Sequence, residues 1–287
     1  MRKNCPKCEY LRYEEKLVPV LRKESLGLGS AVHKGLETRS IDEALKLFDE
    51  SVINSQEEMD KLEINKAIVS AMLTGYFAKF KPFTECKAEL QFDIPILNPL
   101  TRRTSHSFRL QGKIDALAKE NGLWWLVEYK TAGQINQGYF ERLELDEQIT
   151  TYVYAAQRQF RIPIVGIIYR VIKKTSIRRT QKETIEQFCQ RLEKDYIDRP
   201  EFYFFEQQLY RSQNDLKQYE NELWQFTQQL LYEKRNGINY RNSGRCLDWG
   251  RCQYMPICCN EADWELRYEI QEAHEELRSD DNAITDN

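Results

Sequence analysis

Three polar residues interrupt two otherwise apolar runs in the segment 112–130, GKIDALAKENGLWWLVEYK. They are Asp115, Glu128 and Lys130. Between the runs lies Asn121-Gly122, which is the strongest short sequence signal for a two-residue hairpin turn. The segment therefore predicts two antiparallel strands that carry two carboxylates and an amine.

The turn also predicts the register of this hairpin. Glu120 faces Leu123 across the turn, and counting outward brings Asp115 directly opposite Glu128, with Cβ atoms about 5 Å apart. Lys130 lies two residues further and shares that face. Facing carboxylates repel, and a bound divalent cation would reverse the sign of their interaction. We predict a catalytic metal site here; the alternative is a surface salt bridge with a nearby lysine.

Such a site suits phosphodiester hydrolysis. Hard divalent cations bind oxygen ligands, polarise a phosphate and lower the pKa of a bound water. Asp115 and Glu128 are suitable ligands, and the backbone carbonyl of Tyr129 is a further one. Lys130 would orient the attacking hydroxide or offset charge in the transition state. Metal-assisted cleavage of a phosphodiester is the predicted chemistry.

Two further groups of residues fit the same site. His33 follows Gly29-Ser30 on an expected helix, although a lone helical histidine is more often a packing residue. Gln148 and Tyr152 lie one turn apart on another expected helix, where they present a donor and an aromatic ring on one face. The alternative for that pair is the edge of an ordinary amphipathic helix.

Four motifs, in this order, resemble those of the PD-(D/E)xK nuclease superfamily. The resemblance covers roughly residues 1–260 and is closest to the RecB/AddB-type branch, which includes single-domain CRISPR-associated and phage exonucleases. The motifs are Gly29-Ser30-Ala31-Val32-His33, Gly112-Lys113-Ile114-Asp115, Glu128-Tyr129-Lys130 and Gln148-Ile149-Thr150-Thr151-Tyr152.

This resemblance implies a role for each motif residue. His33, Asp115 and Glu128 would bind Mg²⁺ or Mn²⁺, and an imidazole ligand favours Mn²⁺ somewhat. Lys130 would be catalytic. Gln148 and Tyr152 would arrange the site or the DNA. Glu89, on the preceding strand, is a weaker candidate for an outer-shell role.

Six of the eight cysteines lie in two clusters at opposite ends of the chain. In a large chain with no secretory signal this pattern indicates metal ligation rather than disulfides. Cys246, Cys252 and Cys258 need a fourth ligand, which Cys5 or Cys8 could supply. The spacing does not match a usual zinc ribbon, and zinc remains an alternative.

The cysteines also resemble those of iron–sulfur nucleases in the same family. Cys5-Pro6 matches their N-terminal ligand better than Cys8 does, and Cys252-x5-Cys258 contains their C-terminal pattern. The resemblance implies a 4Fe–4S cluster held by Cys5, Cys246, Cys252 and Cys258, which would staple the chain ends together. The five-residue gap after Cys246 departs from the family's C-x-x-C, and Cys8 and Cys259 are spare.

Charge is distributed unevenly along the chain. The net charge is −3, but residues 260–287 carry ten acids and two bases, so the rest has 40 bases and 35 acids. Residues 161–182 carry seven bases and no acid. Such a basic stripe predicts contact with DNA phosphates. The alternative is a solvated strand edge, where lysines block aggregation.

Hydrophobic periodicity predicts an α/β fold with helices on both sides of a mixed sheet. The resemblance implies that this sheet has a restriction-endonuclease-like architecture, with the chain ends joined by the cysteine cluster. A nuclease domain over 1–260 and an acidic C-terminal helix with a disordered tail over 261–287 are expected. Aromatic residues in 200–212 would pack in the core or stack on bases. The expected helices are 26–52 (capped at Ser30), 56–80, 143–160, 181–195, 213–234 and 261–277, and the expected strands are 85–96, the hairpin 107–130 and 164–172.

The sequence therefore predicts a cytoplasmic, metal-dependent DNA exonuclease that acts on single strands or ends in recombination, repair or phage DNA metabolism. No apolar run approaches the length of a membrane span. No P-loop motif occurs, so the protein would act alone or with a separate helicase or recombination protein. Two alternatives are a catalytically idle DNA-binding module that assists a recombination or CRISPR adaptation complex, and a zinc-stapled RNA-processing nuclease.

Overall fold

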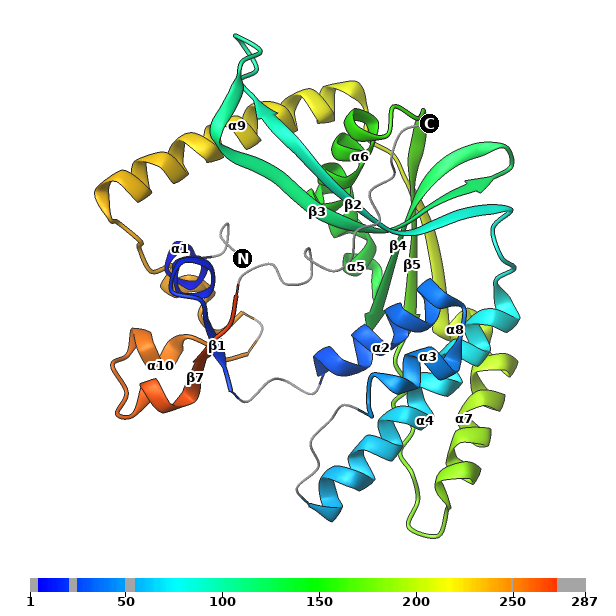
Figure 1. Cartoon of the computed structure of the whole chain (residues 1–287). Helices are drawn as coiled ribbons and strands as arrows, with labels where there is room; N and C mark the ends of the chain where they lie inside the picture. Colours follow the sequence, from blue (N-terminus) through cyan, green and yellow to red (C-terminus); the bar gives the residue numbers. More distant parts are fainter. Residues whose placement is uncertain (1–4, 21–24, 50–54, 249, 273–287) are drawn as a thin grey trace. The chain divides into compact units, whose positions relative to one another are not determined.

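A computed structural model describes residues 5–20, 25–49, 55–248 and 250–272 of the chain. The chain divides into two compact units (Figure 1). The larger unit comprises residues 24–223, and the smaller one combines residues 1–23 with 224–287. No described helix is long and apolar enough to cross a membrane.

A five-stranded sheet organises the larger unit in the order β2-β3-β4-β5-β6. Only β4 and β5 run parallel; the other neighbours are antiparallel. The predicted mixed sheet flanked by helices is thereby confirmed. The strands are β2 (Glu85–Leu97), β3 (Thr104–Glu120), β4 (Leu123–Ala132), β5 (Ile164–Lys173) and β6 (Phe204–Leu209).

Local sequence signals account for where the main elements begin and turn. Asn121 and Gly122 have φ of 51° and 79°, which is the left-handed backbone that an Asn-Gly hairpin turn requires. Ser55 and Asp146 cap the helices that follow them, because each side chain accepts a hydrogen bond from a backbone amide three residues later. The helices of this unit are α2 (Ser25–Thr38), α3 (Ile41–Lys46), α4 (Gln56–Lys79), α5 (Gln137–Glu141), α6 (Glu147–Gln159), α7 (Ile185–Asp198) and α8 (Pro200–Tyr203), with a 3-10 turn over Arg142–Leu145.

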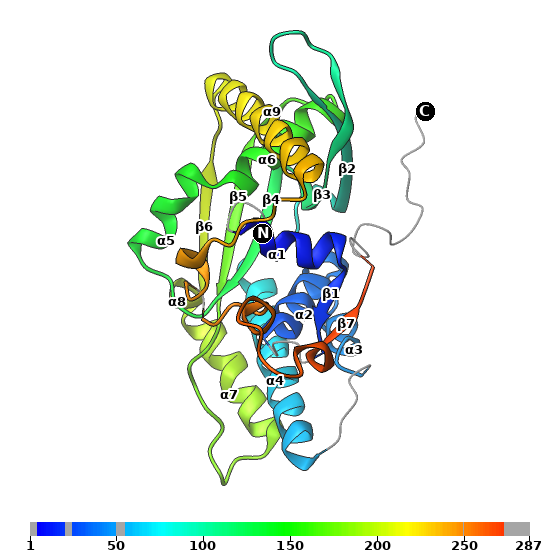
Figure 2. The same ribbon diagram turned by 90° about the vertical axis from the view of Figure 1, so that its left-hand side faces the viewer.

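The two faces of the sheet are covered by different helices (Figure 2). Alternate residues of β3, β4 and β5, such as Ala116, Val127 and Ile168, pack with buried residues of α2, α4 and α7 in the main core. The opposite face carries α6, which contacts β2 and β5, and α5, which reaches Tyr169 of β5 through Tyr139. Glu128 and Lys130 alternate with the core residues of β4 and therefore belong to this second face.

The smaller unit is built from both ends of the chain. Its strands β1 (Leu17–Pro19) and β7 (Tyr268–Ile270) pair antiparallel. Leu11, Tyr254 and Tyr268 form its buried core, and the Tyr254 hydroxyl donates to the Leu17 carbonyl at 2.7 Å. Its other elements are α1 (Pro6–Glu9), a π-helical turn (Tyr10–Glu14), α10 (Met255–Cys258), short 3-10 turns at Ser243–Arg245 and Trp264–Arg267, and the end of α9 (Gln213–Asn236), which runs in from the larger unit.

Three sequence predictions about elements are wrong. The helix over 26–52 is two helices, α2 and α3, because the chain turns at Arg39 (φ 52°) and Ser40 caps α3; residues 50–54 lie outside the described part. Ser30 lies inside α2 and is not its cap. Residues 261–272 form a 3-10 turn and β7 instead of the acidic C-terminal helix, since β1 offers a pairing partner; the predicted disordered tail lies outside the described residues.

The packing of the aromatic segment at 200–212 is clear. Tyr203 and Phe204 are buried and join the main core, and β6 pairs with β5. Core packing, the favoured alternative, is therefore confirmed for these two rings, which are not available to stack on bases.

Candidate active site

The hairpin register is confirmed up to the edge of the site. The β3–β4 ladder runs from Glu120–Leu123 to Ala116–Val127 and stops there. The ladder ends one pair before Asp115 and Glu128, which are not paired. The prediction that these two residues are direct cross-strand neighbours is therefore wrong. At this level the Tyr129 amide of β4 donates to the Asp115 side chain at 2.8 Å, so the Asp115 carboxylate takes the place of a further backbone pair.

Asp115 is held by β4 and by α2. Its Oδ2 accepts a hydrogen bond from the Tyr129 amide at 2.8 Å, and its Oδ1 lies 3.4 Å from Nδ1 of His33. Burial alone would raise the pKa of Asp115, but His33, the Tyr129 amide and the charge on Lys130 outweigh it and hold this pKa below its ordinary value. Asp115 is therefore a carboxylate that stays ionised.

Glu128 lies deep in the same place, with 2% of its surface exposed. Its Oε1 pairs with the Lys130 ammonium, whereas its buried Oε2 has no hydrogen-bond partner. Burial and the negative charge of Asp115 raise the pKa of Glu128 to about 7. A buried carboxylate oxygen without a partner is costly, so this oxygen is placed for a ligand that the protein itself does not supply.

Lys130 carries the positive charge of the site. Burial would lower its pKa, but the charges on Glu128, Asp115 and Asp146 outweigh burial and raise it. Its ammonium is therefore charged at neutral pH. Asp146 was not predicted from the sequence as a site residue; it caps α6, with Oδ1 accepting from the Ile149 amide at 3.1 Å. The available signal was an aspartate two residues before Gln148 at a helix start.

Helix α6 brings Gln148 and Tyr152 to this site. Gln148 Nε2 donates to the Tyr152 hydroxyl at 2.8 Å, as expected for residues one turn apart. Burial, followed by the charges on Glu128 and Asp115, raises the pKa of Tyr152. The phenol therefore stays protonated near the two carboxylates.

Gly112 has a packing role in this region. It pairs with Phe92 of β2, and a Cβ at Gly112 would lie 2.4 Å from the Phe92 ring. That ring in turn lies edge-on to Tyr152, at 6.1 Å between centroids. The glycine of the Gly-x-x-Asp motif thus makes room for the ring against which Tyr152 rests. Glu89, the weaker outer-shell candidate, pairs with Lys113.

Tyr129 anchors the strand between Glu128 and Lys130 from the other face. Its ring lies edge-on to Tyr76 of α4, at 6.0 Å, and to His33, at 6.5 Å. The Tyr76 hydroxyl accepts from Arg170 at 2.7 Å. This buried aromatic contact fixes β4 at the level of the site.

Arg170 belongs to this anchor and not to a DNA-binding stripe. It is 5% exposed, donates to Glu206 at 2.6 Å and stacks on Phe80 with its guanidinium carbon 4.1 Å from the ring centroid. The inclusion of Arg170 in a basic stripe available to DNA is therefore wrong, because its partners come from elements far away in the sequence.

The fit of a metal to the predicted ligands depends on donor chemistry. In the described part of the chain, no group of three or more His, Cys, Asp or Glu side chains is gathered closely enough to hold an ion as the side chains stand. Asp115 and His33 are nevertheless adjacent, and the partnerless Oε2 of Glu128 is buried nearby. An imidazole and two carboxylates suit Mg²⁺ or Mn²⁺, so the donor types fit.

The smaller unit brings the two cysteine clusters together. The Cys8 and Cys252 sulfurs lie 3.5 Å apart, and the Asn242 amide donates to the Cys5 sulfur at 3.4 Å. Burial raises the pKa of the Cys258 thiol, and charge on Cys5, Cys252 and Cys246 raises it further. As the side chains stand, no three of the described cysteines are gathered closely enough to hold a metal. All eight cysteines are free. Cys8, which was left out of the predicted ligand set, is the residue whose sulfur approaches Cys252.

Comparison with known proteins identifies the family. The chain matches the PD-(D/E)XK nuclease superfamily over residues 3–259, and it therefore belongs to that superfamily. No curated protein matches it. A solved structure titled "Crystal structure of SSO0001" is 14% identical, with 62% of this chain and 78% of that chain covered and a TM-score of 0.23. Family membership indicates a nuclease that hydrolyses phosphodiester bonds.

Proposed function

We propose that this protein is a Mg²⁺- or Mn²⁺-dependent DNA exonuclease that acts on single strands or DNA ends. The observation that carries the proposal is the buried Glu128, which has one oxygen on Lys130 and one oxygen without a partner, beside an ionised Asp115. In a family of nucleases, a buried anionic pair of this kind is best explained by a cation that joins it during function.

His33, Asp115 and Glu128 are the residues that would hold the hydrolytic ion. When bound, the ion would polarise the scissile phosphate and lower the pKa of a water. The Asp115–Tyr129 amide hydrogen bond fixes the position of the first carboxylate. The Tyr129 anchor fixes the second, because Glu128 and Lys130 flank that ring on β4.

The remaining side chains would act directly on the substrate. The Lys130 ammonium, charged and held by Glu128, would orient the attacking oxygen and offset negative charge on the phosphate in the transition state. The Gln148 amide and the Tyr152 hydroxyl, already hydrogen-bonded to each other, would position the DNA backbone beside it.

A 4Fe–4S cluster held by Cys5, Cys246, Cys252 and Cys258 is the proposed staple of the smaller unit. The support is the approach of the Cys8 and Cys252 sulfurs from the two chain ends and the amide that faces Cys5, since backbone N–H groups stabilise thiolates. Zinc on the same thiolates is the competing assignment. Metal analysis and visible absorption of anaerobically purified protein distinguish them, because an iron–sulfur protein is brown and a zinc protein is colourless.

The function is tested by incubating the protein with Mg²⁺, Mn²⁺ or EDTA and end-labelled single-stranded DNA, double-stranded DNA and RNA. Metal-dependent release of mononucleotides or short products from a DNA end is the expected result. Cleavage of RNA alone would favour the RNA-processing alternative. Binding of DNA without cleavage in any metal would favour a catalytically idle module that assists a recombination or CRISPR adaptation complex. A separate helicase or recombination protein is the partner we propose for the nuclease.

A further inference from the structure

The chain leaves β5 at the carboxyl end of the strand, next to the part of β4 that carries Glu128 and Lys130. β4 and β5 are parallel, with Lys130 beside Val171 and Ala132 beside Lys173. The Lys174 amide then donates to the Ala132 carbonyl at 2.8 Å. Lys174 is three residues beyond Val171, or about 10 Å along the strand direction. Ligands of open α/β sheets bind outside the carboxyl ends of such parallel strands.

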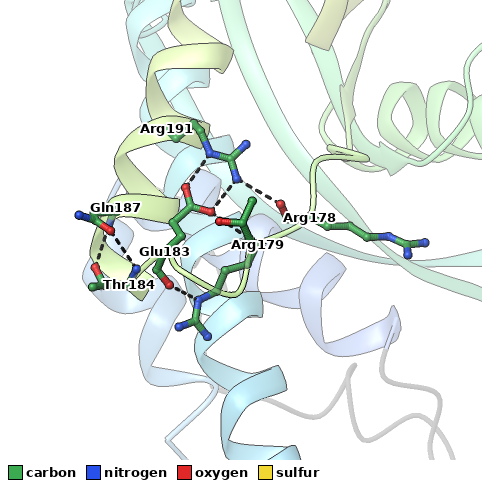
Figure 3. A network of polar contacts seen from close by, with 7 residues as sticks. Arg178, Arg179, Glu183, Thr184, Gln187 and Arg191 are labelled. Carbon is green, nitrogen blue, oxygen red and sulfur yellow. Dashed lines mark hydrogen bonds and ion pairs between the residues drawn. The ribbon is translucent and has the colours of Figure 1, made fainter.

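The loop that follows, residues 174–184, is held in shape by one acid, Glu183 (Figure 3). Glu183 accepts two hydrogen bonds from Arg191 of α7, at 2.7 and 2.8 Å, and one from the Thr180 amide at 3.1 Å. Arg191 also donates to the Arg178 carbonyl at 3.1 Å, and Arg179 donates to the Glu183 carbonyl at 2.8 Å. Glu183, which is the only acidic residue of the loop, therefore uses its carboxylate to hold the loop in shape and does not neutralise the other cations there.

Three cations are left over. The side chains of Lys174, Arg178 and Lys182 pair with no carboxylate and donate to no hydrogen-bond acceptor within the described residues. The Arg178 side chain extends away from the bracing network (Figure 3). Lys174 is half-buried, and burial lowers its pKa, so holding an amine there without an anion costs stability. A lysine kept in such a place is explained by an anion that binds it from outside.

We propose that Lys174, Arg178 and Lys182 form a phosphate-binding arm that grips the backbone of a DNA strand on its way to or from Lys130. The proposal rests on the proposed nuclease function, in that the strand's other contact is the active site. Arg178 suits bidentate contact with a phosphate, and the lysines act as point charges. Backbone contacts of this kind position a strand without reading its sequence, as an exonuclease that moves along DNA requires. The brace around Glu183 presets the arm, which reduces the entropy lost on binding.

The test compares two double variants that each remove two positive charges from the larger unit. Arg178→Ala/Lys182→Ala removes the exposed arm cations. The control, Lys61→Ala/Lys194→Ala, removes two exposed lysines that are paired with Glu57 and Asp198. Binding of a fluorescein-labelled oligothymidine of about 20 nucleotides is measured by anisotropy in EDTA, across salt concentrations from about 50 to 300 mM, and thermal melting checks that both variants fold.

Loss of two single-strand phosphate contacts should reduce the slope of log K against log salt by about 1.4, since each contact contributes about 0.7. We expect the Kd of the arm variant to rise on the order of tenfold at moderate salt, with the control within about twofold of wild type. An unchanged slope and Kd in a folded arm variant would overturn the proposal, as would a wild-type protein that does not bind the oligonucleotide.

The nuclease function and the phosphate-binding arm are refuted by different results. If the wild type binds but cuts no DNA in Mn²⁺, while the arm variant still loses affinity and slope, then the nuclease function falls and the arm stands. If the wild type cuts DNA and the arm variant binds as well as wild type does, then the arm alone is refuted, and its cations would have to serve another acidic partner.

Discussion

Glu128→Gln should stabilise the metal-free protein at alkaline pH, although it removes a residue that the site needs. Glu128 is buried, one of its oxygens has no partner, and its pKa is raised to about 7 by burial and by Asp115. A carboxyl whose pKa is higher in the folded than in the unfolded state contributes its full stability below the unfolded value of 4.5, and the contribution is lost as the pH rises through about 7. Above about pH 7 the wild-type protein is therefore destabilised by its buried carboxylate, whereas the variant with the neutral amide is not.

The size of the effect follows from the pKa difference. At about 1.4 kcal/mol per pKa unit, a rise from 4.5 to about 7 corresponds to roughly 3 kcal/mol at high pH. For a unit of this length, that is a rise in Tm of about 6–12 °C. At about pH 5 the difference should fall below about 1 kcal/mol, because Glu128 is then protonated in the folded protein.

The measurement is thermal or urea unfolding in EDTA at several values between about pH 5 and 9. Glu85→Gln is the matched control, because Glu85 is an exposed β2 residue paired with Lys119, and its loss should change stability by less than about 1 kcal/mol at any pH. Adding Mn²⁺ should reverse the order, since a ligand of the folded state stabilises wild type more than the variant. A Glu128→Gln protein no more stable than wild type at about pH 8 in EDTA would refute this reasoning.

Three further predictions follow from other parts of the molecule. Arg170→Met should destabilise the larger unit by about 3 kcal/mol in urea unfolding, because it leaves Tyr76 and Glu206 without their buried cation. The control, Arg199→Met, changes an exposed helical ion pair and should cost about 0.5 kcal/mol. Equal losses in the two variants would contradict the role of Arg170 in anchoring β4. Glu183→Gln should lower the Tm at neutral pH but not near pH 2. Hydrogen bonds from Arg191 hold the pKa of Glu183 at about 2, so the contribution of Glu183 to stability disappears as the pH falls from 4.5 to 2. A Tm difference that persists in acid would be inconsistent with this prediction. Cys246→Ala should lower both the bound iron and the Tm of anaerobically purified protein, whereas Cys86→Ala, at an exposed cysteine outside the clusters, should change neither; a Cys246→Ala protein with full iron and unchanged melting would count against the staple.

Local patterns in the sequence were enough to predict most of the elements that carry the site. The Asn121-Gly122 turn determines the register of β3 against β4, and the spacing of Gln148 and Tyr152 places both on one face of α6. Alternating and β-branched runs likewise predicted β2 and β5. These features depend on neighbours within a few residues, which a sequence displays directly.

Features that depend on distant partners were not predictable in the same way. The β3–β4 ladder stops before Asp115, where the Tyr129 amide binds the Asp115 side chain. Arg170 looks like one base among seven until Tyr76 and Glu206 are brought to it by the fold. Residues 268–270 follow a helical pattern, yet they form a strand because β1, some 250 residues earlier in the chain, pairs with them.

The most direct test of the central claim is the cleavage rate of single-stranded DNA by Lys130→Ala, compared with Lys113→Ala, in saturating Mn²⁺. Both lysines lie on the same hairpin, and Lys113 is paired with Glu89, whereas Lys130 is held beside Glu128 in the site. Loss of a group that stabilises transition-state charge should reduce kcat by about 10²–10³, with Lys113→Ala staying close to wild type. Lys130→Ala protein that is folded and cleaves DNA at the wild-type rate would contradict the assignment of this site as the nuclease centre.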